Sequence, residues 1–164
     1  MNVRQATQQD AVKIIEVMKD AEASGFMLYN PNERQLTSES LEKLISHINA
    51  AAKSSFFVAE ENEEILGYLM VKGEHLSRTS HRASIAIGVH SLNRGKGTGT
   101  KLFEYVINWA KQQQLHRLEL TVIEHNHQAI HLYKKMGFKE EGIKRDSLWI
   151  DGQFVNEIYM SLLL

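Results

Sequence analysis

A glycine-rich segment in the middle of the chain, residues 89–100, limits the possible folds more than any other stretch. Alternating β-branched residues precede it and predict a strand, and apolar residues at helical spacing follow it. A strand, a glycine-rich turn and a helix in this order point backbone N–H groups outward at the helix start. Gly97 and Gly99 would let a phosphate approach the main chain closely. Arg94 and Lys96 supply formal charge, so the segment predicts a site for a phosphate-bearing cofactor.

The spacing of the glycines decides which phosphate loop this is. A Walker loop requires Gly, four residues and then Gly-Lys-Ser/Thr, but Lys96 precedes its glycine. The dinucleotide-binding loop requires Gly-x-Gly-x-x-Gly, whereas Gly95, Gly97 and Gly99 follow the spacing Gly-x-Gly-x-Gly. The loop instead matches Arg/Gln-x-x-Gly-x-Gly/Ala, beginning at Arg94. It therefore resembles the pyrophosphate loop of the GNAT superfamily of acetyl-CoA-dependent N-acetyltransferases.

A second motif, in residues 126–138, resembles the other signature of this superfamily. In that signature an Asn begins a helix, an Ala and a Tyr lie four residues apart, and Gly-Phe follows the helix end. Each residue also has an ordinary structural role, because Asn126 is a good N-cap, Gly137 ends a helix well and Tyr133 lies on an apolar stripe. The glycine segment alone is also consistent with an ordinary turn before a helix, although the cofactor loop is the better interpretation. The two motifs together, with a strand between them, favour the GNAT interpretation.

The periodicity of the rest of the chain predicts the same fold. Apolar residues at helical spacing predict helices that cover about residues 8–24, 38–48, 98–113 and 126–136. Alternating patterns predict strands at residues 2–6, 55–60, 65–71, 81–90, 117–123, 138–146 and 153–163. The order β-α-α-β-β-β-α-β-α-β-β is that of the GNAT fold, an α/β fold with a mostly antiparallel sheet and one splayed parallel strand pair. We expect residues 1–164 to form a single domain of this kind.

Charge and composition exclude several classes of protein. With 19 Lys and Arg against 20 Asp and Glu, the chain lacks the basic excess that nucleic-acid binding requires. It contains no Cys, which excludes a thiol nucleophile and fits a reducing compartment. The N-terminus lacks the apolar core of a signal peptide, and no apolar run approaches the length of a membrane span. We therefore expect a cytoplasmic protein with no nucleic-acid or membrane partner.

The resemblance implies that acetyl-CoA is the co-substrate and that a primary amine, on a small molecule or a protein N-terminus, is the acceptor. The strand that ends at Val89 would diverge from the strand at 117–123 and open a slot for the pantetheine arm. A backbone N–H near Val89 would polarise the thioester carbonyl, and Tyr133 would protonate the departing thiolate. The residues expected to bind the cofactor are Ile87, Val89, Arg94, Gly95, Lys96, Gly97, Thr98, Gly99, Thr100 and Asn126.

The general base is where the sequence departs from the family pattern. Many relatives have a glutamate on the strand before the loop, at the position of Ser84, and serine is a poor base. Glu33 is the expected replacement, because the segment between the first two helices forms a wall of the acceptor site in relatives. His81 and Glu60 are alternatives. The missing glutamate also keeps a different function open, that of a CoA-binding sensor or interaction module with little or no turnover.

Three further features have both a functional and a structural interpretation. Residues 27–29 suit either an apolar acceptor pocket or the packing of a loop. His127 and His131 lie four residues apart, but Gln128 stands where a metalloprotease has its glutamate, so a solvated helix face is the better interpretation and no metal site is expected. Residues 148–155 predict a hairpin around Asp-Gly. Its aromatic residues suit either a homodimer contact or core packing.

Overall fold

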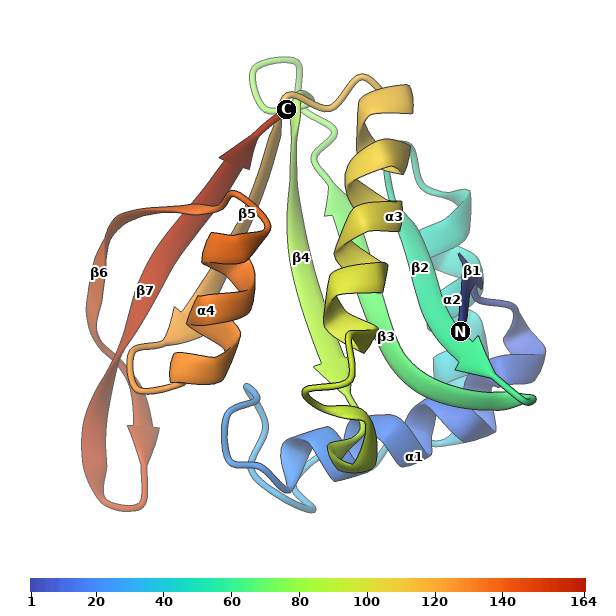
Figure 1. Cartoon of the computed structure of the whole chain (residues 1–164), viewed down its shortest axis with the longest axis horizontal. Helices are drawn as coiled ribbons and strands as arrows, with labels where there is room; N and C mark the ends of the chain where they lie inside the picture. Colours follow the sequence, from blue (N-terminus) through green and yellow to red (C-terminus); the bar gives the residue numbers. More distant parts are fainter.

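The computed structural model describes residues 1–164 and contains one seven-stranded sheet with helices on both faces (Figure 1). The strands are β1 Asn2–Gln5, β2 Ser55–Glu61, β3 Glu64–Gly73, β4 Arg82–Val89, β5 Arg117–Ile123, β6 Lys139–Ile150 and β7 Gln153–Leu163. The helices are α1 Ala11–Glu22, α2 Ser38–Ala50, α3 Thr98–Gln112 and α4 His127–Lys135. The element order predicted from the sequence is confirmed.

The strand order in the sheet is β1-β2-β3-β4-β5-β7-β6, and every neighbouring pair is antiparallel except β4 and β5. The parallel pairing of β4 with β5 is short, since it extends only from the pair Arg82–Arg117 to the pair Ser84–Glu119. Beyond Ser84 the two strands diverge, and Figure 1 shows the gap that widens between them toward their C-terminal ends. The predicted splayed parallel pair is therefore confirmed.

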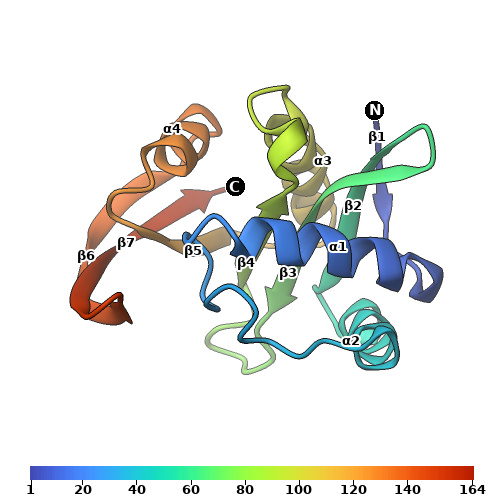
Figure 2. The same cartoon turned by 90° about the horizontal axis from the view of Figure 1, so that it is seen from below.

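Two hydrophobic cores lie on opposite faces of the sheet. Phe56 and Phe57 are neighbours on β2 and both are buried, because successive strand side chains point to opposite faces. Phe57 belongs to the core under α3 and α4, and Phe56 belongs to the core under α1 and α2. Figure 2 shows the two helix layers and shows that β5, β6 and β7 have no helix on the α1–α2 side. None of the helices combines the length and hydropathy of a membrane-spanning helix.

The strand predicted at residues 138–146 and the first arm of the hairpin predicted at residues 148–155 form one strand, β6. The alternation stops near residue 146, but β6 continues to Ile150 through an irregularity between Lys144 and Leu148, where Asp146 has a φ of 50°. A bulge of this kind lets pairing resume after the alternation of side chains is interrupted. The predicted turn at residues 151–152 is present, with Gln153 as the first residue of β7.

An ion-pair network fixes β1 to the start of α1. The two terminal nitrogens of Arg4 donate to the Asp10 carboxylate at 2.8 and 2.9 Å, and its Nε donates to Glu60 of β2 at 2.9 Å. Asp10 also accepts a hydrogen bond from the Thr7 backbone N–H at 2.7 Å, and the two residues form a capping box at the start of the helical segment. The Arg4 hydrogen bonds lower the pKa of Asp10 to about 2.

Replacing the Asp10 carboxylate should lower the free energy of unfolding by an amount that depends on pH. Because the folded state lowers the pKa of Asp10, the charged carboxylate stabilises the fold above its ordinary pKa, and this stabilisation is lost as the pH falls toward 2. Asp10→Asn should therefore reduce the free energy of unfolding at pH 7 by about 1–2 kcal/mol. Urea unfolding should show the difference from wild type shrinking below about pH 4.

The matched control is Glu39→Gln, which removes an exposed ion pair with Lys43 one turn along α2. Its effect on stability should be small at every pH. If the difference in free energy of unfolding between wild type and Asp10→Asn stays the same from pH 7 to pH 3, the proposed role of the Arg4–Asp10 ion pair is contradicted.

Candidate functional site

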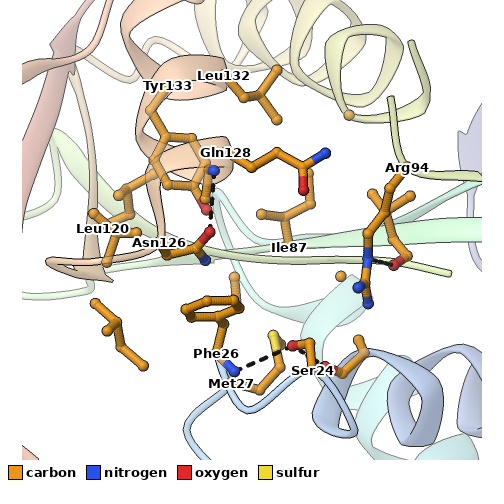
Figure 3. A pocket seen from close by; sticks show the side chains of 18 of the residues that line it. Ser24, Phe26, Met27, Ile87, Arg94, Leu120, Asn126, Gln128, Leu132 and Tyr133 are labelled. Atoms are coloured by element: carbon orange, nitrogen blue, oxygen red, sulfur yellow. Dashed lines mark hydrogen bonds between the residues drawn. The ribbon is translucent and has the colours of Figure 1, made fainter. Parts of the chain in front are cut away.

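A cleft of about 750 Å³ opens where β4 and β5 diverge. It is lined by both strands, by the loop before α3 and its first turn, by α4, and by residues 26–28 after α1. Figure 3 shows Asn126, Gln128, Leu132 and Tyr133 along one side, Ser24, Phe26 and Met27 along the other, and Ile87 between them. β4 pairs with β3 as far as Val89 but with β5 only as far as Ser84. One edge of β4, from residue 85 to 89, therefore has no strand partner and faces the cleft.

The loop before α3 together with the first residues of that helix, residues 94–100, forms one end of the cleft and is called here the glycine loop. Gly95 and Gly97 have φ values of 71° and 89°, in the left-handed region that favours glycine. A Cβ at either position would meet no atom within 4 Å, so open space lies in front of this backbone. The N–H groups of the first turn of α3 have no carbonyl partner within the helix. These groups and the helix dipole favour an anion at this end.

Gly99 has a different reason for lacking a side chain. It lies in the first turn of α3 and lines the cleft, but a Cβ there would lie 2.7 Å from Cδ2 of Leu132 on α4. The sequence pattern predicts the same purpose for Gly97 and Gly99, close approach of a phosphate. The structure instead assigns Gly99 to the contact between α3 and α4, which sets the width of the cleft at this point.

Arg94 is held across the end of β4. Its Nε donates to the carbonyl of Val89 at 3.1 Å, and its guanidinium lies 3.7 Å from the Asp20 carboxylate of α1. Asp20 also accepts hydrogen bonds from the backbone N–H and the hydroxyl of Ser91, at 2.5 and 2.7 Å. These contacts fix the start of the glycine loop to α1 and leave Arg94 lining the cleft.

A second cation at this end is one that the sequence pattern does not predict. Lys135, in the last turn of α4, lines the cleft, and its Nζ lies 3.4 Å from the hydroxyl of Thr100. Lys96, which is expected in the site from the sequence, is exposed and does not line the cleft. The other expected cofactor-binding residues all line it. No local motif identifies Lys135, because only the packing of α4 beside α3 brings it to the glycine loop.

Asn126 and Tyr133 project from α4 toward the cleft (Figure 3). The Asn126 side-chain oxygen accepts a hydrogen bond from the Ala129 backbone N–H at 3.2 Å, so its amide nitrogen remains able to donate. Tyr133 is 7% exposed, and its ring packs against Phe103 and Phe138 at centroid distances of 5.7 and 6.1 Å. Burial raises the pKa of the Tyr133 phenol, so the hydroxyl is protonated at neutral pH.

The candidate bases named from the sequence do not line the cleft. Glu33 lies in an exposed loop, where its carboxylate accepts a hydrogen bond from the Asn30 backbone N–H at 2.8 Å. Glu60 pairs with Arg4, and His81 precedes β4 at the end of the strand away from the cleft. A base role for Glu33 therefore stays a prediction, and the structure does not bring this carboxylate together with the other predicted site residues.

The part of the cleft beside the C-terminal end of β5, called here the far end, includes residues 26–28, Leu148 of β6 and Glu157 of β7, because Glu157 pairs with Ile123 and the Phe26 ring lies 5.5 Å from that of His125. Of the segment 27–29 named from the sequence, Tyr29 does not line the cleft, and its ring lies 4.6 Å from the guanidinium of Arg34. Leu148 and Glu157 were not predicted, because only the pairing of β6 and β7 beside β5 brings them to the cleft.

Comparisons with known proteins agree with this architecture. The family model described as "Acetyltransferase (GNAT) domain" matches residues 3–159. An L-amino acid N-acetyltransferase of Escherichia coli K12 is 32% identical over 102 residues, which are 60% of this chain and 61% of that relative. This chain thus spans about three fifths of the length of that curated relative.

Solved structures extend the likeness to the whole chain. An acetyltransferase of the GNAT family from Streptococcus pneumoniae has a TM-score of 0.93 and 26% identity, and the match covers 99% of this chain and 98% of that one. A phosphinothricin acetyltransferase from Sinorhizobium meliloti, solved in complex with acetyl-CoA, has a TM-score of 0.89 and 18% identity, with 99% of this chain and 88% of that one covered. At 18% identity, the similarity to the Sinorhizobium meliloti structure shows a shared fold only.

Proposed function

Because the chain belongs to the GNAT family of acetyltransferases, we propose that it transfers the acetyl group of acetyl-CoA to the nitrogen of a primary amine. The observation that carries this proposal is the cleft between β4 and β5, which joins an unpaired strand edge to the N-terminus of α3. The acetyl-CoA in the complex of a protein with the same fold supports the choice of acetyl donor. The L-amino acid N-acetyltransferase of Escherichia coli supports an amine as acceptor.

The cleft offers a suitable partner to each part of acetyl-CoA. The free N–H groups at the start of α3 would bind the pyrophosphate, and Arg94 and Lys135 would supply positive charge there. The unpaired edge of β4 at residues 85–89 would pair with the amides of the pantetheine arm as a neighbouring strand does. The side-chain amide of Asn126 would donate to the arm from the opposite side.

The residues around the middle of the cleft would then carry the chemistry. The backbone at the end of β4 would polarise the thioester carbonyl through an N–H donor near Val89. Holding the thioester beside the amine supplies much of the rate by proximity. The amine nitrogen bonds to the carbonyl carbon, the carbon–sulfur bond breaks, and Tyr133 gives its proton to the departing sulfur. The proton that the amine loses passes to a base or to water.

We also propose that residues 1–164 form one acetyltransferase domain. One continuous sheet includes strands from both ends of the chain, and β1 and β7 lie in it with the strands between them. A cytoplasmic location and a homodimer remain predictions. Trp149 and Phe154 pack edge-on at a centroid distance of 4.7 Å near the tip of the last hairpin and are exposed, which excludes core packing, one of the two interpretations that the sequence left open for these aromatics.

The proposal is tested by measuring the release of CoA thiol from acetyl-CoA in the presence of a panel of primary amines. Turnover that requires both acetyl-CoA and an amine is the expected result, and mass spectrometry should find the acetyl group on the amine nitrogen. Tight binding of acetyl-CoA without turnover on any amine would contradict the proposal. That outcome would favour the CoA-binding sensor that the serine at position 84 leaves open.

Gly97→Val should abolish CoA binding. A β-branched residue is strained at a φ of 89°, and its side chain would enter the open space in front of the α3 N-terminus. Calorimetry with CoA measures the loss directly. The matched control is Gly152→Val in the β6–β7 turn, which has a similar φ of 78° and equally open surroundings and should keep its CoA affinity. A folded Gly97→Val protein with wild-type CoA affinity would overturn the assignment of the glycine loop.

Tyr133→Phe should slow the acetyl transfer while leaving the fold and CoA affinity intact. The substitution removes one hydroxyl and keeps the ring packed against Phe103 and Phe138. Loss of a positioned general acid lowers the rate constant of the chemical step by roughly 10²–10⁴-fold. Single-turnover kinetics measures this step, and Tyr105→Phe on the exposed face of α3 is the control. An unchanged chemical step in Tyr133→Phe rules out the acid role.

A further inference from the structure

The charges that line the cleft are unevenly placed. Arg94 and Lys135 lie at the glycine loop, whereas Glu157 is the one carboxylate among the lining residues. Glu157 on β7 lies directly opposite Ile123 on β5 in the antiparallel register, so both side chains share one face of the sheet. Val122, the preceding residue of β5, packs in the core under α3 and α4. Ile123 and Glu157 therefore point to the opposite face, which no helix covers there (Figure 2).

The Glu157 carboxylate is largely buried and only partly compensated. Its side chain is 12% exposed, and its one ionic partner is the Lys144 ammonium, 3.5 Å away and 46% exposed. The Lys144 ammonium also lies 5.9 Å from the ring centroid of Tyr159. A carboxylate has several lone pairs that accept hydrogen bonds, and a single ion pair at 3.5 Å leaves others available to a ligand. The far end of the cleft thus holds a carboxylate that can accept hydrogen bonds from a cationic ligand.

The surroundings of this carboxylate are apolar. Phe26, Met27 and Leu28 form one wall of the far end, and Leu148 forms another. Leu28 is 75% exposed and Phe26 is also exposed, so these side chains present apolar surface to a ligand that enters the cleft. A lone carboxylate beside apolar walls suits a ligand with one ammonium group on a hydrocarbon skeleton.

We propose that Glu157 binds the ammonium of the acceptor, and that the acceptor is a primary amine on an apolar skeleton with no free carboxylate beside the amine. This inference rests on the proposed acetyl transfer. The ammonium would donate charge-assisted hydrogen bonds to Glu157, while its hydrocarbon part packs on residues 26–28. A carboxylate next to the amine would lie close to Glu157 and be repelled, because Lys144, the cation beside Glu157, is already paired with it and does not line the cleft.

The test compares leucine with leucinamide, which has the same side chain and amine but an uncharged amide in place of the carboxylate. The wild-type protein should acetylate leucinamide with the higher kcat/KM. Glu157→Gln should lower kcat/KM for leucinamide by roughly 10- to 100-fold, the effect of losing a charged hydrogen-bond partner, and mainly through KM. The preference for leucinamide over leucine should shrink in the variant. The two amines differ in intrinsic reactivity, but this difference cancels when the ratio of their kcat/KM values is compared between the wild-type protein and Glu157→Gln.

Glu124→Gln is the matched control, since Glu124 directly follows β5, accepts a hydrogen bond from Asn156 at 3.2 Å and lies outside the cleft. It should retain the leucinamide kcat/KM, and Glu157→Gln should retain wild-type affinity for CoA. A peptide that begins with leucine distinguishes the two sources of such an amine: acetylation of the peptide indicates a protein N-terminus, and acetylation of leucinamide alone indicates a small molecule.

Two results separate this inference from the proposed function. If the wild-type protein acetylates amines but prefers leucine, or if Glu157→Gln keeps the wild-type kcat/KM for leucinamide, then the inference is wrong and acetyl transfer stands. If the wild-type protein acetylates no amine, both are overturned.

Discussion

The short pairing of β4 with β5 is the constraint on which the rest of the site depends. Three residue pairs join the two parallel strands, and beyond them one edge of β4 has no partner. The end of β4 stays paired with β3 instead, and Gly88 lies so close to Tyr68 of β3 that a Cβ there would be 2.5 Å from the Tyr68 ring. Backbone groups without partners must be satisfied by water or by a ligand. A ligand that carries amide groups can therefore form hydrogen bonds with this unpaired edge of β4, as a neighbouring strand would.

The divergence of these strands also brings together parts of the chain that are distant in sequence. α3 follows β4 and α4 follows β5, so the two helices lie on either side of the gap, with Gly99 in contact with Leu132. Asp20 ties α1 to the start of the glycine loop through Ser91. The loop after α1, which forms one wall of the far end, is thereby connected to the anion-binding end. The geometry of the cleft follows from these contacts rather than from any single motif.

Local patterns in the sequence predict most of the fold and one end of the site. The glycine loop and the Asn126 helix start depend on a few neighbouring residues, so the spacing of those residues is enough to identify them. Lys135 and Glu157 could not be found in this way, because each reaches the cleft only through the pairing of separate elements. Glu33 is a different case: its segment follows the first helix as predicted, but its carboxylate accepts a hydrogen bond from the Asn30 backbone N–H and does not line the cleft, so its role as base stays a prediction.

Amide hydrogen exchange with and without acetyl-CoA tests the central claim most directly, that the unpaired edge of β4 and the start of α3 bind the acetyl donor. Saturating acetyl-CoA should slow exchange at residues 85–89 and at Thr98–Thr100, while the amides of β1 and α2 exchange at unchanged rates. Calorimetry on the same sample establishes that binding is saturated. Unchanged exchange at residues 85–89 under those conditions, with protection on another surface, would contradict the account.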